Sequence, residues 1–282
     1  MGIVGKKAFS QIREWKYKGR AWAAFLLGIG ISVKNCGVYL AYVNQADGMT
    51  QIFEPFVVLG STIPFLMGTT LGGILLLSDA PFLKQISEYE VLREGYKRWF
   101  ISEILYVILA SVLYALVILL GSCLFTACFS RAFIANVWSD SLKRLAYQQP
   151  EYVILKYRFV FPFPELLDAV SPMRAVAETF VFQSLYLSLL GICMFVVNLL
   201  SEVNIGWIVA SLIHIWGYIA YANSGMVISF RLSPLCCAST AYHYVKGYDL
   251  SKSYSVFFIL VWIIIFISIG AKKFFKTGFN RY

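Results

Sequence analysis

The sequence predicts an all-α, polytopic membrane protein with about six transmembrane helices. Hydrophobic residues make up 59% of its 282 residues and charged residues only 14%, whereas soluble domains are close to half apolar and a quarter charged. The apolar residues also form long uncharged runs, such as 104–120 and 257–270. Only lipid or neighbouring membrane helices can cover such runs. We therefore expect a single transmembrane domain, 1–282.

The chain begins with a basic segment, residues 5–20, that has a helical pattern. Ala8, Ile12 and Trp15 recur at helical spacing, while charged residues such as Lys7 occupy other faces. A helix of this kind lies in the headgroup layer of a membrane. We expect an interfacial amphipathic helix here; the alternative is a basic flank to the first span.

Six segments have the length and apolar composition of transmembrane helices. The second contains Pro55, Pro64 and the small-residue run 68–73, and small residues allow close contact between membrane helices. The third is long enough to tilt or to extend beyond the hydrocarbon. The expected spans are residues 21–43, 52–77, 99–127, 177–200, 206–229 and 255–271.

Basic residues determine the expected orientation. Residues 1–20, 78–98 and 272–282 carry most of those that flank spans, and the turn 44–50 carries none. The positive-inside rule then places both termini in the cytoplasm and residues 128–176 outside, in a multi-pass plasma membrane protein. Basic residues beside spans contact anionic lipid, so the net charge of +9 does not indicate a nucleic-acid partner.

Catalytic motifs are missing from the sequence. It has no G-x-x-x-x-G-K-[ST] loop to hold nucleotide phosphates. The two histidines, His214 and His243, do not have the spacing of a zinc protease, and there is no G-x-S-x-G nucleophile motif. We expect no catalytic residue and no bound cofactor in this chain, and any ATP would be hydrolysed by another chain.

The connection between the second and third spans predicts a short helix along the inner membrane face. Ser78 or Asp79 can cap this helix, and Pro81 falls in its first turn. Phe82 and Tyr89 then recur at helical spacing, and charged residues lie between and after them. The segment is amphipathic; the alternative is a solvated connector.

The order of a basic interfacial helix, two spans, an inner helical loop and four further spans resembles the ABC-2-type permease family of bacterial ABC transporters. The stretches Ser78-Asp-Ala-Pro-Phe82 and Arg98-Trp-Phe-Ile101 are similar to those of bacterial members. The resemblance implies an exporter of a peptide or hydrophobic compound, in which two identical or homologous permeases pair above a dimer of ATPase subunits that bind ATP and Mg. It also implies that a coupling helix contacts the ATPase through Asp79, Pro81, Phe82, Glu88, Tyr89, Glu90, Arg93 and Glu94.

Charged residues and one histidine fall in or at the ends of the expected spans: Lys34, Glu54, Glu103, Glu178 and His214. Lys34 lies near the middle of the first span, where an unpaired charge is costly. It either pairs with Glu54 or Glu178 at the outer ends of other spans, or lines a path for polar or anionic cargo. His214 lies on an apolar helix, where packing with one hydrogen bond is expected.

The six cysteines lack the spacing of a metal site. Three fall inside spans, and three near the expected outer surface, where Cys128 could form a disulfide with Cys236 or Cys237.

Two other functions fit a polytopic chain. An ion- or proton-coupled secondary transporter would show inverted repeats and broken helices with mid-membrane acids, and the halves of this sequence do not match. A non-transporting assembly or sensor protein is the other. An associated ATPase would distinguish the permease from both.

Overall fold

The computed structural model describes residues 3–78, 80, 95–148, 164–201, 203–223, 225–248 and 250–280, with side chains as far as Lys273. Within these residues the fold is a helical bundle with one small parallel sheet. Its two strands are two residues long each and pair Thr50 with Ala132 and Gln51 with Phe133. The first half comprises α1 (Ile3–Arg13), η1 (Glu14–Tyr17), α2 (Gly19–Gln45), β1 (Thr50–Gln51), α3 (Glu54–Ser61), α4 (Ile63–Leu77), α6 (Tyr96–Phe129) and β2 (Ala132–Phe133). The second half comprises α7 (Asp140–Gln148), α9 (Pro164–Ala169), α10 (Pro172–Ser201), α11 (Gly206–Ala222), α12 (Val227–Arg231), α13 (Pro234–Ala238), η2 (Ala241–His243) and α14 (Lys252–Asn280).

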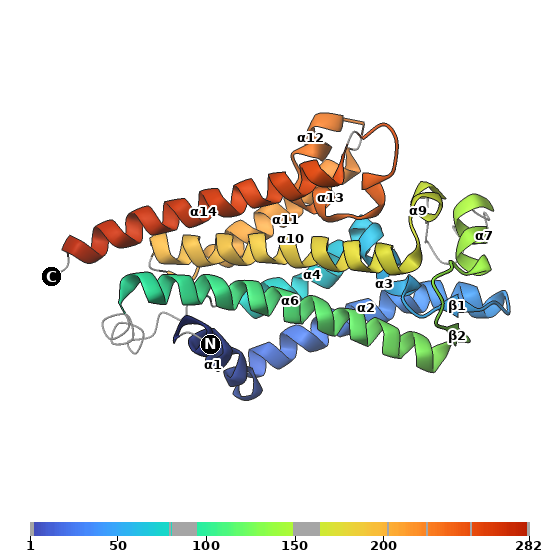
Figure 1. Cartoon of the computed structure of the whole chain (residues 1–282), viewed down its shortest axis with the longest axis horizontal. Helices are drawn as coiled ribbons and strands as arrows, with labels where there is room; N and C mark the ends of the chain where they lie inside the picture. The colour runs from blue at the N-terminus through green and yellow to red at the C-terminus, as the bar shows by residue number, and fades with distance from the viewer. Residues whose placement is uncertain are drawn as a thin grey trace.

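The long helices run side by side along the bundle (Figure 1). One end, which we call the α1 end, holds α1, the start of α6 and the C-terminal end of α14. The opposite end, which we call the α7 end, holds β1, β2, α7 and α9. The first and last helices of the chain therefore reach the same end of the bundle.

In the part of the chain that the structure describes, four helices are long and apolar enough to cross a membrane: α2, α6, α10 and residues 252–273 of α14. The expected spans 21–43, 99–127, 177–200 and 255–271 fall within them. A transmembrane helix needs about 20 apolar residues, and α11, with 17, is shorter than the expected span 206–229. The structure thus supports a membrane-embedded protein in which four helices, or five if α3 and α4 together count as one, have the length and composition of spans; the number of six stays a prediction.

The expected second span is broken. The axes of α3 and α4 meet at 95°, and Thr62 between them has an extended backbone with φ −97° and ψ 109°. Proline explains the break, because Pro64 has no N–H to donate to the carbonyl four residues earlier. That carbonyl, on Gly60, accepts a hydrogen bond from Thr240 N at 3.4 Å, and the Ser61 carbonyl accepts from Ser239 Oγ at 2.8 Å.

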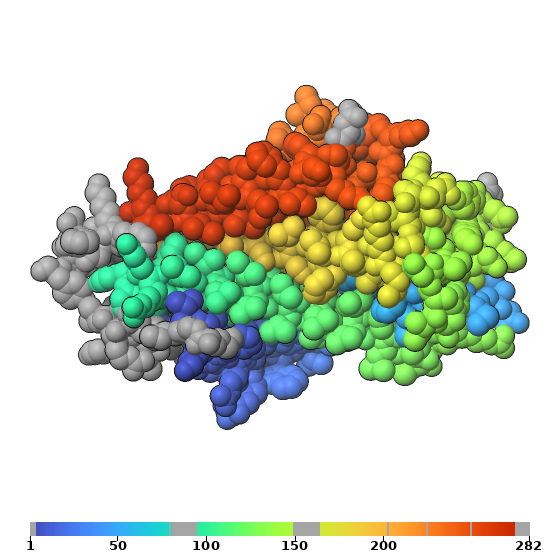
Figure 2. Space-filling model, viewed as in Figure 1, coloured from blue at the N-terminus to red at the C-terminus, as the bar shows by residue number. Residues whose placement is uncertain are grey.

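The second half of the chain packs around α10. In its apolar core 78% of the residues are buried, against 22% in α14, 33% in α2 and 39% in α6. The other three spans therefore each keep an exposed side. On α14, which forms a strip along the surface in Figure 2, the exposed apolar side chains are Phe257, Leu260, Trp262, Ile264, Ile265 and Ile269. Such a surface suits lipid.

Small residues bring α2 and α4 into contact. A Cβ atom on Gly72 would lie 2.5 Å from the Ala24 carbonyl oxygen and 3.0 Å from Gly28 N, so only glycine fits there. Tyr114 of α6 closes the contact by donating from its hydroxyl to the Thr69 carbonyl at 2.6 Å. The small-residue run in the second span thus serves helix packing, as the sequence indicates.

The basic N-terminal segment folds as two elements instead of one helix over 5–20. The α-helix α1 ends at Arg13, the 3₁₀ turn η1 follows, and Lys18 is extended before α2 begins. This corner lets α1 pack against α6. Ala8 and Gln11 on that side are buried, while Phe9 and Ser10 are exposed.

Candidate functional site

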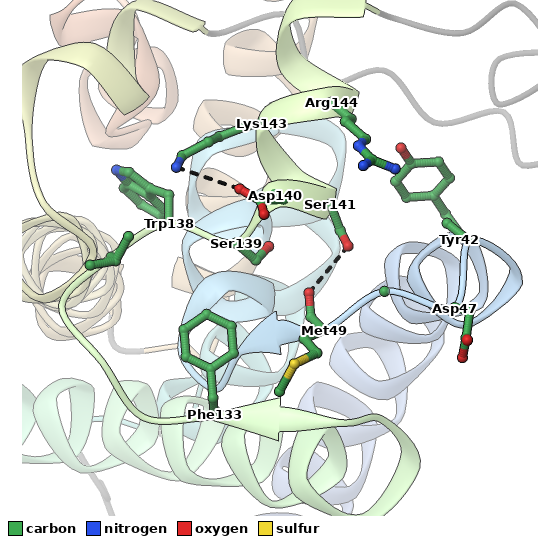
Figure 3. Close-up of a pocket in the computed structure, with 13 residues that line it drawn as sticks. Tyr42, Asp47, Met49, Phe133, Trp138, Ser139, Asp140, Ser141, Lys143 and Arg144 are labelled. Atoms are coloured by element: carbon green, nitrogen blue, oxygen red, sulfur yellow. Dashed lines mark hydrogen bonds and ion pairs between the residues drawn. The ribbon is translucent and has the colours of Figure 1, made fainter.

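A cleft of about 420 Å³ opens at the α7 end of the bundle (Figure 3). Its walls are the end of α2, the turn that leads to β1, the segment after β2, and the first turn of α7. Ser141 donates to the Met49 carbonyl at 3.1 Å and so joins two of these walls. The residues that line the cleft are Tyr42, Ala46, Asp47, Gly48, Met49, Phe133, Val137, Trp138, Ser139, Asp140, Ser141, Lys143 and Arg144.

The cleft has charged groups of both signs. Lys143 and Asp140 approach to 3.8 Å, and Asp47 pairs at 2.9 Å with Arg131. Both pairs are largely exposed, so each contributes little stability. With Arg144 added, the cleft and its edge suit a polar ligand better than an apolar one.

Glu54 lies beneath the cleft and is completely buried. Its Oε2 atom accepts hydrogen bonds from the hydroxyls of Thr50 at 2.7 Å and Tyr39 at 2.9 Å, and from Gln51 N at 3.1 Å. Ser139 adds two more, from its backbone N to Oε1 at 2.6 Å and from its hydroxyl to Oε2 at 2.7 Å. Every partner can donate to the carboxyl group, so hydrogen bonds from the chain's own residues hold the Glu54 side chain in place.

The Glu54 centre joins segments that are far apart in the chain. It connects α2, β1, α3 and the residue that precedes α7, since Ser139 also caps α7 by accepting from Leu142 N at 3.2 Å. The sequence predicts Glu54 as a polar residue at the end of a span, but its partnership with Ser139, 85 residues away, has no local signal. This centre fixes the walls of the cleft.

The second acid expected at a span end, Glu178 of α10, forms a separate centre. It accepts from Lys252 Nζ at 2.6 Å, from the Tyr244 hydroxyl at 2.6 Å and from Arg174 Nε at 3.0 Å. Lys252 also contacts the Tyr244 hydroxyl. These contacts fix the start of α14 against α10.

Neither acid pairs with Lys34. Glu54 and Glu178 use the donors described above, and Lys34 is exposed on α2 with no partner among the residues that the structure describes. The expected ion pair of Lys34 with either acid is therefore wrong, because both acids lie within polar centres formed by other residues.

His214 of α11 is buried, with polar partners on both ring nitrogens. Nδ1 lies 2.7 Å from the Tyr186 hydroxyl, and Nε2 lies 3.0 Å from the Met67 carbonyl. A carbonyl can only accept, so Nε2 carries the proton and Nδ1 accepts from tyrosine. His214 thus makes more contacts than the single hydrogen bond expected, and it joins α11 to α10 and α4.

His243 lies in η2, beside the start of α14. Its Nε2 lies 3.0 Å from the Cys237 carbonyl and 3.1 Å from Ser255 Oγ. Burial lowers the pKa of His243 to about 4, so the ring is neutral at neutral pH.

All six cysteines are free thiols. Cys128 is exposed near the end of α6, whereas Cys236 and Cys237 are buried in α13. Their thiols point to the backbone carbonyls of Gly217 and Arg231, respectively. The outer disulfide is therefore not formed in this structure.

A polar junction at the α1 end has no counterpart in the sequence analysis. Asn198 of α10 donates from Nδ2 to the Ala80 carbonyl at 2.7 Å, and its Oδ1 accepts from Gly206 N at 2.6 Å. One buried amide therefore joins the segment after α4, the end of α10 and the start of α11. A lone asparagine in an apolar run is the only sequence signal for it.

A second junction at this end joins α1 to α6. Gln11 Nε2 donates to Glu103 Oε1 at 2.6 Å, and Trp15 Nε1 donates to the Tyr106 hydroxyl at 3.1 Å. Glu103 is buried between the two helices. The N-terminal helix is thus fixed to α6 by polar contacts.

The residues expected to contact an ATPase lie outside the described part of the chain: Asp79, Pro81, Phe82, Glu88, Tyr89, Glu90, Arg93 and Glu94. In the residues that the structure does describe, no group of His, Cys, Asp and Glu could hold a metal ion. No family model, curated protein or solved structure matches the chain.

Proposed function

We propose that this chain is the membrane-spanning permease subunit of an ATP-driven exporter, energised by separate ATPase subunits. The bundle of long apolar helices supports a role within a membrane. The chain contains no phosphate-binding loop, so driving force from ATP has to enter through a surface in contact with another protein. The segment 79–94 is our candidate for that surface.

The observation that carries this proposal is the Asn198 junction. The segment 79–94 leaves α4 and returns to α6, so its displacement moves both. Asn198 holds the Ala80 carbonyl at 2.7 Å and Gly206 N at 2.6 Å, which extends the displacement to α10 and α11. A push on this one segment therefore reaches four helices.

The α1–α6 junction supports the same mechanism. Gln11 and Trp15 bind α6 within its first three turns, close to where segment 79–94 joins it. The ammonium of Lys7 lies 5.9 Å from the centre of the Trp99 ring, a cation–π distance. An interfacial α1 would hold the start of α6 at the membrane surface while the segment beside it moves.

In the proposed assembly two copies of the permease, or this chain and a homologous one, pair in the plasma membrane above an ATPase dimer that binds ATP and Mg. Both termini lie in the cytoplasm, in agreement with the positive-inside rule. The cargo is a peptide or another compound with apolar character, exported through a path between the two permeases.

The test is isolation of the complex. The full chain, tagged at one end, is purified in mild detergent from membranes of its own source, and stoichiometric partners are sequenced. We expect a partner with a G-x-x-x-x-G-K-[ST] loop, and ATP hydrolysis by the complex in lipid vesicles. Replacing Glu88 and Tyr89 together with alanine should reduce recovery of the partner or hydrolysis by the complex.

The matched control is Lys246→Ala, an exposed residue between η2 and α14, which should leave both readouts unchanged. A chain that purifies with no ATPase contradicts the proposal. An intact complex whose hydrolysis does not respond to the double variant contradicts only the coupling role of segment 79–94.

One alternative has an observation in its favour. A broken span that carries a buried acid is typical of ion- or proton-coupled transporters, and Glu54 is the first residue of α3, the helix that ends at the α3–α4 break. The five hydrogen bonds to Glu54 favour a structural role instead, because all of them come from residues of the chain's own fold. Solute flux in vesicles driven by a pH gradient without ATP would favour this alternative.

A further inference from the structure

Lys34 is an exposed charge deep within a membrane helix. It lies 15 residues after the start of α2 and 11 before its end. At a rise of about 1.5 Å per residue it is about 16 Å or more from either end of the helix. Lysines close to helix ends extend their ammonium group to the membrane surface, but Lys34 is far from both ends. A lipid-facing charge at this depth is costly.

The composition of α2 also argues against lipid around it. Its mean hydropathy is 1.5, against 2.1 in α10, 2.5 in α14 and 2.7 in α6. Yet only 33% of its apolar core is buried, whereas α10, the next least apolar, is 78% buried. The helix least suited to lipid is therefore one of the most exposed, which indicates that something other than lipid covers it.

The face around Lys34 has room for another molecule. A Cβ atom on Gly30, one turn before Lys34, would meet no atom within 4 Å, and one on Gly37 would meet only the Phe125 ring at 4.0 Å. Ala23 and Ala41 continue the exposed face in both directions. Small side chains thus flank the lysine directly, at Gly30 and Gly37, and the large exposed side chains Leu26 and Leu27 lie nearer the start of the helix.

A second copy of the chain cannot neutralise Lys34 with its described acids. Glu54, Glu103 and Glu178 are held by hydrogen bonds within their own chain. The remaining described acids lie outside the candidate spans: Glu14, Asp47, Asp140, Glu165 and Asp168. None of the acids that the structure describes is therefore available to neutralise Lys34, which leaves water or an anion as its partner.

We propose that the exposed face of α2 lines a water-filled path through the membrane and that Lys34 is the anion-binding residue of this path. The inference rests on the proposed permease function, in which a second copy of this chain closes the path from lipid. Its cargo then carries an anionic group, such as a carboxylate, phosphate or sulfate. An ammonium in a narrow aqueous path concentrates anions and repels cations.

The test measures the reactivity of a cysteine placed at Gly30, in a Cys128→Ser parent that lacks the exposed native thiol. The full-length protein in vesicles is treated with small thiosulfonate reagents, one anionic and one cationic. We expect Gly30→Cys to react with both, and faster with the anionic reagent. Adding Lys34→Gln should lower the ratio of the two rates roughly tenfold, as removal of a unit charge nearby predicts. Leu27→Cys, one turn before Gly30 on α2, serves as a second reporter should the first variant fail to fold.

The matched control is Leu120→Cys on α6, a 58% exposed residue of a helix that suits lipid, and it should stay unreactive. Equally unreactive cysteines at positions 30 and 27 would overturn the path, and this result is also what a lysine bound to a lipid headgroup would give. A rate ratio that Lys34→Gln leaves unchanged would overturn the anion-binding role.

These measurements need neither ATP nor an ATPase. Unreactive cysteines in a chain that still recovers its ATPase would remove the anion path and leave the permease function standing. Reactive, charge-selective cysteines in a chain that recovers no ATPase would support the anion path and contradict the ATP-driven permease function.

Discussion

Ser139 binds Glu54 through two groups, its backbone N–H to Oε1 at 2.6 Å and its hydroxyl to Oε2 at 2.7 Å. The residue that caps α7 is therefore attached to the first residue of α3. This pair fixes the floor of the cleft, and it predicts how the fold responds when the acid is altered.

Glu54→Gln should destabilise the protein by about 2 kcal/mol or more, because an amide NH₂ group would face N–H and O–H donors in a buried site. Thermal unfolding in detergent measures the loss. The control is Asp47→Asn, which removes an exposed ion pair and should change stability by less than about 0.5 kcal/mol. Equal stability of the two variants would contradict a structural role for Glu54.

Gly72→Ala should destabilise the protein by about 1–3 kcal/mol, since the new methyl group would lie 2.3 Å from the Tyr114 hydroxyl and 2.5 Å from the Ala24 carbonyl oxygen. Gly121→Ala is the matched control. Its nearest neighbour is Ile29 at 3.8 Å, so the better helix propensity of alanine should leave stability unchanged or raised. Comparing the thermal unfolding of both variants separates the effect of the close helix contact from the effect of helix propensity.

Asn198→Ala should cost about 1–3 kcal/mol, because it leaves the buried Gly206 N–H and Ala80 carbonyl without their partner. Asn198→Asp keeps an acceptor for Gly206 N but loses the donor to Ala80. If the junction transmits force, both variants should weaken ATPase coupling, even where Asp recovers some stability. Asn223→Ala, which removes an exposed bond within one helix, should affect neither readout.

Stability should fall with acidification, through His243. Its pKa is lowered to about 4 in the folded protein and is near 6.5 otherwise, so the unfolded chain binds the proton first. The contribution of the neutral ring is complete above about pH 6.5 and is lost as the pH falls toward 4. Glu178 and Lys252 are the charged groups near this ring. The melting temperature of His243→Gln should therefore depend less on pH between 7 and 5 than that of the wild type.

The orientation is testable with two exposed positions at opposite ends of the bundle. A cysteine at Ser10 on α1 should be closed to an impermeant reagent applied outside intact cells, and one at Ile134 after β2 should react, both in the Cys128→Ser parent. Reactivity at Ser10 alone would reverse the orientation and place segment 79–94 outside the cell.

The sequence predicts the long helices well, because an apolar run bounded by charges determines a membrane helix almost alone. Residues 99–127 and 177–200 were expected as spans, and α6 and α10 extend only a few residues beyond them. The break at Thr62 is not predicted, although Pro64 causes it. A proline inside an apolar run is compatible with a kink, and the size of this bend depends on Ser239 and Thr240, almost 180 residues later.

The candidate site, like the fold, has features that the sequence predicts and features that depend on contacts between distant segments. Glu54, Glu178, Lys34 and His214 stand out in the sequence as polar residues in apolar surroundings. Their partners do not, because contacts such as Glu54 with Ser139 or Glu178 with Lys252 join segments that only the complete fold brings together. The cleft at the α7 end depends on these contacts and was not predicted.

The central position of α10 has a consequence for biosynthesis. Its neighbours come from both sides of the sequence, α4 and α6 before it and α11 and α14 after it. When α10 leaves the ribosome, α11 and α14, which pack against it in the complete fold, have not yet been made. The core around α10 is therefore complete only after the last helix has been made, and a chain truncated before α14 would leave the α14-facing side of α10 uncovered.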